Sequence, residues 1–362
     1  MEGKWRRAGN CRIEGGHFPG SEPVFASFRI AAWVFAAFAA VAGAQAAERV
    51  RVAVGTEGFV HVPLYLAIDA GLMKSEGIDI DVIQFRGGGA AMAGLASGNA
   101  EFCSCSVQNA VNAAAKGTDV RLVGTLISQY ASNVVIRGDV AERLRITNDT
   151  PAKDRVTALR GLTIAVSGAG GSADFLMRYL GRQAGLSSER DFTILYMSGN
   201  GPMLAAFAQK RIDGFALSSP TSDAAMVRYK GMMLLNMARG EWEGLRGYPS
   251  IALSGRLSWL KSHEDTAHRF LRALGLADRM LHEKPDSAKA IVKKRFAGIE
   301  TAIYDAAWES NLATYPANPR IEEADVARAI AFLVGIQGQK VPGAARDYVD
   351  DSYVDAAIAS LK

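Results

Sequence analysis

Four turns rich in glycine and serine carry the residues that could bind a small molecule. Each turn lies between an apolar strand and a helix, and a helix N-terminus offers free backbone N–H groups and about half a positive charge. These turns are therefore predicted to bind an anion. Their candidate ligand-binding residues are Gly88, Gly89, Ser104, Ser106, Gln108, Gly171, Ser172, Ser198 and Asn200.

The helix ends alone supply too little binding free energy. Each contributes roughly 0.3–1 kcal/mol, or up to about 2 kcal/mol when it is partly buried. A micromolar ligand needs about 8 kcal/mol. Hydroxyl groups that bond the ligand directly, and apolar surface buried as the site closes, are expected to provide the remainder. The alternative interpretation of the glycines is that strand-to-helix turns need left-handed backbone and bind nothing.

The loop after the first strand adds Thr56, Glu57, Phe59 and His61, at the carboxyl end of the sheet where α/β proteins meet their ligands. Phe59 could stack on a ligand, and Glu57 could meet an amino group. For each residue the alternative is a solvated loop side chain or a packed hinge side chain.

Catalysis finds little support in the sequence. It contains no GxSxG or HExxH motif, and of its five histidines only His61 lies near these turns. The glycine-rich loops also lack the lysine and the glycine spacing of nucleotide-binding motifs. Cys103 and Cys105 share one face of a strand, where we expect buried small residues, because a disulfide closing so short a loop would be strained. We therefore expect no catalytic residue, metal or cofactor.

The elements that position these turns occur twice, at a constant offset along the chain. Val54 and Val166 end equivalent strands (166 − 54 = 112), and the same offset relates Gly89, Glu101 and Ser106 to Gly201, Asp213 and Ser218. Two similar α/β lobes are predicted, with their helix starts lining the cleft between them. Chance similarity is the alternative, because every βα unit needs an apolar strand and an amphipathic helix.

The rest of the chain completes these lobes. Residues 133–138 are expected to form a strand leading into the second lobe, and residues 248–253 a return strand that pairs with it as the second connection. From residue 266 onward the pattern is mainly helical, and these helices are expected to support the first lobe. The predicted organisation is a leader at 1–46, lobe 1 at 47–132 and 250–362, and lobe 2 at 133–249.

Composition and the N-terminus set the protein's location. The chain has 362 residues, 49% of them hydrophobic, and a net charge of +4 that is concentrated near the N-terminus, so it has no basic face for nucleic acid. Residues 30–44 form an apolar run after Arg29, followed by small-residue cleavage options ending at Ala44 and Ala46. This is typical of a secretory signal and is too short for a spanning helix. We expect a periplasmic monomer.

Three segments together resemble the nitrate/sulfonate/taurine class of ABC-transporter solute-binding proteins, which includes binders of thiamine pyrimidine precursors. They are VPLYLAIDAGLMKSEGIDIDVIQFRGGGAAMAGLASGNAEF, LRGLTIAVSGAGGSADFLMRYLGRQAGL and LAAFAQKRIDGFALSSP. The resemblance implies an α/β type II periplasmic-binding fold, with two lobes joined by two crossing connections. It also implies delivery of a bound solute to an ABC permease and ATPase complex at the inner membrane, and together with the helix starts described above we expect that solute to be small, organic and anionic.

The resemblance also implies where the ligand contacts fall. Besides the turns and the loop at residues 56–59, it adds Ser218, Ser219 and Thr221. The sequence departs from many relatives at Cys103 and Cys105 and in TEGFVH after the first strand. Two alternatives stay open: an enzyme like the fungal synthase of the thiamine pyrimidine, which has the same fold, and a periplasmic sensor or accessory binder.

Overall fold

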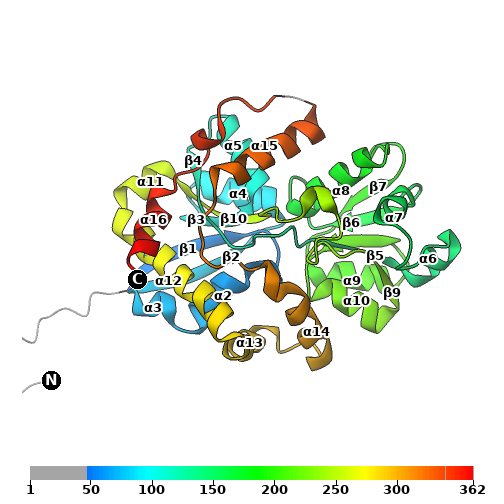
Figure 1. The fold of residues 1–362 in the computed structure, drawn as a ribbon, viewed down its shortest axis with the longest axis horizontal. Coiled ribbons are helices and arrows are strands. Elements are labelled where there is room, and N and C mark those ends of the chain that lie inside the picture. Colours follow the sequence, from blue (N-terminus) through cyan, green and yellow to red (C-terminus); the bar gives the residue numbers. More distant parts are fainter. Residues whose placement is uncertain (1–46, 339, 362) are drawn as a thin grey trace, which may run out of the picture. The chain divides into compact units, whose positions relative to one another are not determined.

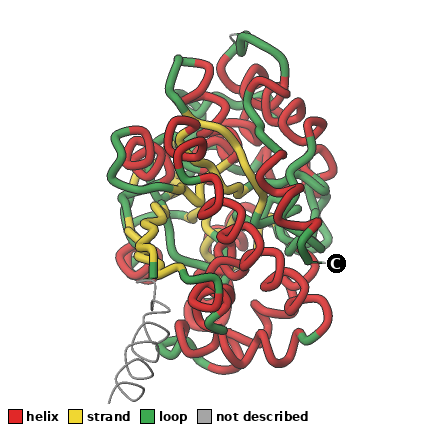
Figure 2. Tube along the Cα trace, turned by 90° about the vertical axis from the view of Figure 1, so that its left-hand side faces the viewer, coloured by secondary structure: helices red, strands yellow, loops and turns green. Residues whose placement is uncertain are grey.

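The structure is a computed structural model that describes residues 47–338 and 340–361. The predicted leader, residues 1–46, lies outside the described residues. In the described part, ten strands form two separate five-stranded sheets flanked by helices (Figures 1 and 2). We call the first sheet with its helices lobe 1 and the second sheet with its helices lobe 2. No helix in this part of the chain is long and apolar enough to span a membrane.

The sheet of lobe 1 has the order β2-β1-β3-β10-β4. Strands β1, β2 and β3 are parallel, whereas β10 runs antiparallel to both of its neighbours. Its strands are β1 (Glu48–Val54), β2 (Ile78–Gln84), β3 (Phe102–Ser106), β4 (Val120–Thr125) and β10 (Ile251–Arg256).

The sheet of lobe 2 repeats this arrangement with the order β7-β6-β8-β5-β9. Here β5 is the antiparallel strand in the fourth position. Its strands are β5 (Asn133–Arg137), β6 (Thr163–Val166), β7 (Thr193–Tyr196), β8 (Gly214–Leu217) and β9 (Gly231–Leu235). The α/β fold with two lobes, predicted from the sequence, is therefore present.

The crossing strands differ from expectation in one respect. Strands β5 and β10 were expected to pair with each other, but β5 lies between β8 and β9 while β10 lies between β3 and β4. Each therefore completes the sheet of the lobe that it enters. The chain passes between the lobes twice, at residues 126–132 and 236–250.

The helices cover both faces of the two sheets (Figure 1). In lobe 1 the early helices are α2 (Val62–Asp69), α3 (Leu72–Ser75), α4 (Gly88–Ala96) and α5 (Val107–Ala115). Those of lobe 2 are α6 (Gly138–Leu144), α7 (Ala152–Thr157), α8 (Ser172–Gln183), α9 (Asn200–Ala208) and α10 (Thr221–Tyr229). The C-terminal helices are α11 (Leu257–Ser262), α12 (Glu264–Glu283), α13 (Pro285–Lys293), α14 (Thr301–Asn311), α15 (Glu323–Gln337) and α16 (Ser352–Ala359).

The repeat predicted from the sequence falls on equivalent elements. The same constant offset relates the ends of β2 and β7, the starts of α4 and α9, and the starts of β3 and β8. It also explains the acidic residue of the pattern. The Glu101 carboxylate accepts a hydrogen bond from the Arg51 backbone N–H at 2.7 Å, and Asp213 accepts the equivalent bond from Thr163 at 2.9 Å. In each lobe this carboxylate ties the central strand to the strand beside it.

The C-terminal helices do more than support lobe 1. Helix α12 packs on α2 and α16 as expected, but α15 contacts both α5 of lobe 1 and α8 of lobe 2, and α14 contacts α10 of lobe 2. In the middle of this bridge, Phe332 of α15 stacks on Tyr179 of α8 with ring centroids 4.7 Å apart. The C-terminal helices therefore support lobe 1, as expected, and two of them also contact lobe 2.

Candidate functional site

A small buried cavity lies where the two lobes meet. Its volume is ≈ 30 Å³, which is room for one or two water molecules or for the head of a small ligand. We call it the inner cavity. Its lining residues are Gly55, Thr56, Val60, His61, Gly88, Ser104, Cys105, Ser106, Ser132, Ser167, Gly171, Ser172, Ala173, Leu217, Ser218 and Ile251.

A larger, more open cavity of ≈ 510 Å³ adjoins the inner one, and we call it the outer cavity. The two cavities share Gly55, Thr56 and Ser167. The remaining lining is mostly polar and includes the charged residues Glu57 and Arg86. Its other lining residues are Gln84, Phe85, Gly87, Ser198, Gly199 and Asn200.

Three helices begin at the inner cavity. Helix α4 begins at Gly88, α5 begins after Ser106, and α8 begins at Ser172. The Ser106 hydroxyl accepts a hydrogen bond from the Asn109 backbone N–H at 3.2 Å, which satisfies one free donor of α5. The fourth predicted helix start, that of α9 at Asn200, lines the outer cavity instead. The inner cavity therefore receives partial positive charge from both lobes.

Glycines bring the backbones of the two lobes close together beside this cavity. A Cβ added to Gly89 would lie 2.8 Å from the carbonyl oxygen of Ala169, and one added to Gly87 would lie 3.1 Å from the Cα of Gly168. Gly87 also has a φ of +94°, which disfavours other residues. The predicted importance of the RGGGA turn thus has a steric reason, because larger residues would separate the lobes.

Direct hydrogen bonds also join the two lobes around the cavity. The Phe59 backbone N–H donates to the Ser219 carbonyl at 2.9 Å, and the Asn200 side-chain amide donates to the Glu57 carbonyl at 3.0 Å. On another side, the Tyr130 hydroxyl donates to the Ser172 carbonyl at 2.5 Å. The lobes are therefore in contact, and most of the residues that line the inner cavity are buried.

His61 is the predicted residue with the most unusual surroundings. It is 1% exposed, and its Nδ1 lies 2.7 Å from the Ser104 hydroxyl. Its Nε2 is buried without a hydrogen-bond partner among the described residues. Burial lowers the pKa of His61 to about 4, and a backbone contact with Thr56 acts in the opposite direction. The ring is therefore neutral at pH 7, with one nitrogen available to a ligand.

Ser172 supplies a second unpartnered atom at the same cavity. Its Oγ is buried and forms no hydrogen bond within the described part of the chain. A buried polar atom without a partner costs about 1–3 kcal/mol, so native structures rarely retain one without a reason. Because His61 belongs to lobe 1 and Ser172 to lobe 2, a ligand that bonded both would hold the lobes together.

The structure brings together most of the predicted binding residues. Lining the inner cavity are Thr56, His61, Gly88, Ser104, Ser106, Gly171, Ser172 and Ser218. Lining the outer cavity are Thr56, Glu57, Ser198 and Asn200. Five predicted residues line neither cavity: Phe59, Gly89, Gln108, Ser219 and Thr221.

Phe59 faces the core of lobe 1 instead of a ligand. It is fully buried, and its ring makes edge contacts with Phe296, Tyr304 and Trp308 at centroid distances of 5.0, 5.4 and 6.2 Å. The suggestion that it stacks on a ligand is therefore wrong, and the packed side chain that was left open as an alternative describes it.

Gln108 and Ser219 also have structural partners. The Gln108 amide donates to the Tyr248 hydroxyl at 2.8 Å, and the Ser219 hydroxyl accepts from the Asn311 amide at 2.8 Å. Both contacts join the turns at the cavity to segments that cross or bridge the lobes. Gln108 and Ser219 therefore hold the turns at the cavity in place without lining it.

Two serines that line the inner cavity were missed. Ser167 directly follows β6, just as Gly55 follows β1, and the offset of the repeat relates the two positions. Gly55 also lines the inner cavity and was not predicted, so the position directly after a strand, at the carboxyl end of the sheet, is the signal that could have identified both residues. Ser132 lies just before β5, in the crossing segment. Nothing in its local sequence distinguishes it from other loop serines.

The cysteine pair and the metal question are simpler. Cys103 and Cys105 are buried on one side of β3, as expected, but the structure joins their sulfur atoms, which the sequence analysis did not expect. Within residues 47–338 and 340–361, no group of three or more His, Cys, Asp or Glu residues could hold a metal ion.

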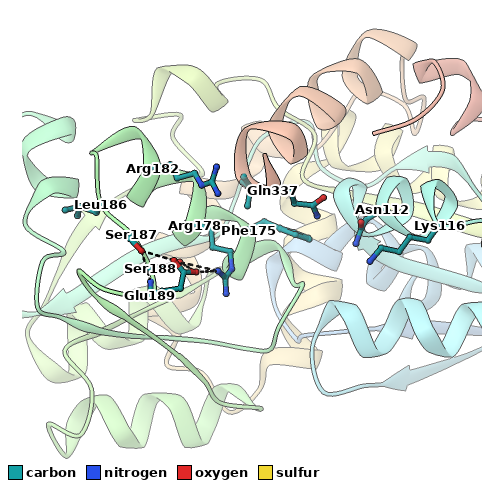
Figure 3. A pocket seen from close by; sticks show the side chains of 11 residues that line it. Asn112, Lys116, Phe175, Arg178, Arg182, Leu186, Ser187, Ser188, Glu189 and Gln337 are labelled. Carbon is teal, nitrogen blue, oxygen red and sulfur yellow. Dashed lines mark hydrogen bonds and ion pairs between the residues drawn. The ribbon is translucent and has the colours of Figure 1, made fainter. Parts of the chain in front are cut away.

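A third cavity, of ≈ 540 Å³, lies between α5, α8 and α15 (Figure 3). Its cations are largely engaged. The Arg178 guanidinium pairs with Asp174 at 3.1 Å and with Glu189 at 2.8 Å, and Arg182 donates to the Gly335 carbonyl at the end of α15 at 2.9 Å. We therefore interpret this cavity as a gap beside the contact between α8 and α15, and not as a ligand-binding site.

Comparisons with known proteins show the family to which the chain belongs and other proteins with its fold. Residues 58–288, more than half of the chain, match the family described as NMT1/THI5 like. A curated relative, "Putative binding protein YtlA" of Bacillus subtilis (strain 168), is 25% identical over 266 residues, which are 70% of this chain and 73% of the relative.

Solved structures share the fold at low identity. The alkanesulfonate-binding protein SsuA of Xanthomonas axonopodis pv. citri, bound to MOPS, has a TM-score of 0.64 and 19% identity over 85% of this chain and 97% of its own. The periplasmic nitrate-binding protein NrtA of Synechocystis PCC 6803 has a TM-score of 0.64 and 13% identity over 87% of this chain and 89% of its own. A desulfurization enzyme, DSZB, has a TM-score of 0.60 and 14% identity over 87% of this chain and 100% of its own.

Proposed function

The chain belongs to the NMT1/THI5-like family, and we propose that it is a periplasmic solute-binding protein that captures a small anionic organic solute between its two lobes. The observation that carries this proposal is the inner cavity, where three helix N-termini and several serine hydroxyls from both lobes meet. Such a cavity binds an anion through N–H and O–H donors.

The two adjoining cavities indicate the shape of the solute. The inner cavity accommodates a compact charged head such as a sulfonate or carboxylate, while the outer cavity, with Arg86 and Glu57, accommodates a polar tail. The relatives described as binding alkanesulfonate and nitrate support an oxyanion as the head group.

Delivery to an ABC permease and ATPase complex follows as the proposed role. It requires export, for which residues 1–46 are the proposed leader, and lobes that open and close on the solute. We propose 47–132 with 250–362 as lobe 1 and 133–249 as lobe 2. The protein is proposed to act as a monomer without a catalytic residue. Permease and ATPase genes beside its own would support import, whereas a kinase gene would favour sensing.

An enzyme is the second candidate, because DSZB has the same fold. The two candidates differ in the fate of the solute. A binding protein releases its ligand unchanged, so mass spectrometry of the ligand after prolonged incubation should recover the starting compound only. A converted product would instead assign a catalytic role to the cavity.

Thermal unfolding with a panel of candidate solutes tests the binding proposal directly. Alkanesulfonates, carboxylates, nitrate and aminopyrimidines are the classes to compare. A ligand at 100 times its Kd stabilises the folded state by about 2.7 kcal/mol, which is readily detected as a rise in Tm. If compounds of no class raise the Tm, the proposed function is rejected.

Replacing Ser172 with alanine sharpens this test. Because the Ser172 Oγ has no partner among the described residues, its removal is expected to leave the stability of the free protein unchanged or to raise it. The stabilisation by an anionic ligand should fall by about 0.5–1.5 kcal/mol, the value of one hydrogen bond. The matched control is Ser262→Ala on helix α11, far from the cavities, which should not change the stabilisation by ligand. Equal ligand stabilisation in wild type and Ser172→Ala would exclude Ser172 from the site.

A further inference from the structure

The inner cavity contains almost no side-chain charge. Among its described lining residues there is no aspartate, glutamate, lysine or arginine, and His61 is the one residue that can become a cation. An anion that enters such a cavity loses its hydration and needs compensating positive charge. Helix N-termini supply only partial charges, so the contribution of His61 decides how well an anion is held.

The geometry around His61 suits a protonated ring. An imidazolium donates from both nitrogens, and here Nδ1 lies 2.7 Å from the Ser104 hydroxyl oxygen, which can accept that bond. The other nitrogen, Nε2, has no partner within the described residues, and His61 lines the inner cavity. A protonated His61 would therefore have its Nδ1 donor satisfied by Ser104, the Thr56 backbone also favours the protonated ring, and Nε2 forms no hydrogen bond to a described residue.

We propose that His61 takes up a proton when an anionic ligand enters the inner cavity, so that the ligand is held by an imidazolium–oxyanion pair. This inference rests on the proposed function, because it concerns the same cavity. In this proposal, His61 makes the site bind anions in preference to neutral solutes, because a neutral solute gains nothing from the added proton.

The charged groups around His61 do not pair with its ring, which leaves the ligand as the partner of the imidazolium. Tyr65 of α2 lies beside the ring at a centroid distance of 5.8 Å, and Arg295 covers Tyr65 and pairs with Asp69. The charged groups on the adjoining and facing elements are Glu57 and Arg86, which line the outer cavity, Asp174 of α8, which pairs with Arg178, and Asp223 of α10, which accepts a hydrogen bond from Ser222. Of these charged residues, none lines the inner cavity.

The proton uptake has a defined direction with pH. Burial holds the pKa of free His61 at about 4, so about one molecule in a thousand is protonated at pH 7. A bound anion raises that pKa. The complex then carries more protons than the free protein, and the affinity for an anion increases as the pH falls, by up to about tenfold per pH unit. The increase ends near pH 4, where free His61 is itself protonated.

Isothermal titration calorimetry measures this directly, with ethanesulfonate as the first probe because its charge is constant between pH 5 and 8. Titrations at one pH in buffers of different ionisation enthalpy give the number of protons taken up. We expect up to one proton per ligand for wild type, and binding up to about tenfold tighter at pH 6 than at pH 7. His61→Gln keeps an N–H donor but cannot be protonated, so it should bind more weakly and equally at both pH values.

The possible failures are distinct. Ethanesulfonate binding to wild type without proton uptake, and with equal affinity at pH 6 and 7, would overturn the inference, because a neutral Nε2–H would then be the donor. Failure of wild type to bind ethanesulfonate, nitrate or benzoate at any pH would reject the proposed function together with the inference. Thermal unfolding checks that His61→Gln is folded, and since the wild-type titrations decide the question alone, a misfolded variant would not protect the inference.

Discussion

Gly89→Ala is expected to weaken ligand binding by about tenfold to a hundredfold while each lobe stays folded. Gly89 lies in the first turn of α4, and an alanine Cβ there would come within 2.8 Å of the Ala169 carbonyl oxygen across the cleft. Relieving such an overlap costs about 1–3 kcal/mol, and each 1.4 kcal/mol changes the affinity about tenfold. The cost arises only when the lobes close. Alanine also favours the helix, so lobe 1 itself should lose no stability.

The internal repeat provides a matched control for this variant. Gly201 is the repeat equivalent of Gly89, in the first turn of α9, and a Cβ added there meets no other atom within 4 Å. Gly201→Ala should therefore bind like wild type. Titration calorimetry gives the two affinities, and small-angle X-ray scattering shows whether the lobes of Gly89→Ala stay apart with ligand present. If Gly89→Ala binds as tightly as Gly201→Ala, the close approach of these loops is not part of binding.

The repeat is also the part of the fold that the sequence predicted best. The pattern of strand, glycine turn and helix is determined by residues that are close together in the chain, so it can be recognised in each copy by itself. It placed the starts of α4 and α9 and the acidic residues Glu101 and Asp213, whose carboxylates bond the equivalent strands β1 and β6. The offset does not reach Ser167, because its equivalent Gly55 also lines the inner cavity and was not predicted either.

Contacts between distant segments account for the errors. Phe59 was considered a ligand contact because it lies in a cleft loop, but its aromatic partners Phe296, Tyr304 and Trp308 come from the C-terminal helical region, far along the chain. The bridging roles of α14 and α15 likewise depend on surfaces of both lobes. Local periodicity shows that a side chain will be buried without showing which element will cover it.

Asp278→Asn is expected to stabilise the protein by more than about 1 kcal/mol at pH 8, because the buried aspartate must keep a proton to stay neutral whereas asparagine needs none, and each unit of raised pKa corresponds to about 1.4 kcal/mol. Asp278 lies on the buried face of α12, is 0% exposed, and neither carboxyl oxygen has a hydrogen-bond partner in the described residues. Burial raises the pKa of the Asp278 carboxyl well above its usual range. The asparagine has nearly the same shape and cannot ionise.

The pH dependence follows from the raised pKa. The folded state holds the Asp278 proton at pH values where the unfolded chain, with a pKa of about 3.9, has released it. The protonated carboxyl therefore stabilises the fold fully below about pH 4, and this contribution is lost as the pH rises through the folded-state value. Urea unfolding of wild type and Asp278→Asn should thus coincide near pH 4 and diverge toward pH 8.

A carboxylate on the same helix distinguishes this effect from a general loss of charge. Asp265 pairs with Arg269 on the surface, with 84% of its side chain exposed, and such pairs contribute at most about 1 kcal/mol. Asp265→Asn should therefore be no more stable than wild type at any pH. Equal stabilities of wild type and Asp278→Asn at pH 8 would mean that the core of lobe 1 accepts the ionised carboxylate. Helix α12 packs on α2, and α2 directly follows His61. The same urea unfolding experiments therefore also show whether the part of lobe 1 that carries His61 stays stable over the pH range in which His61 is tested.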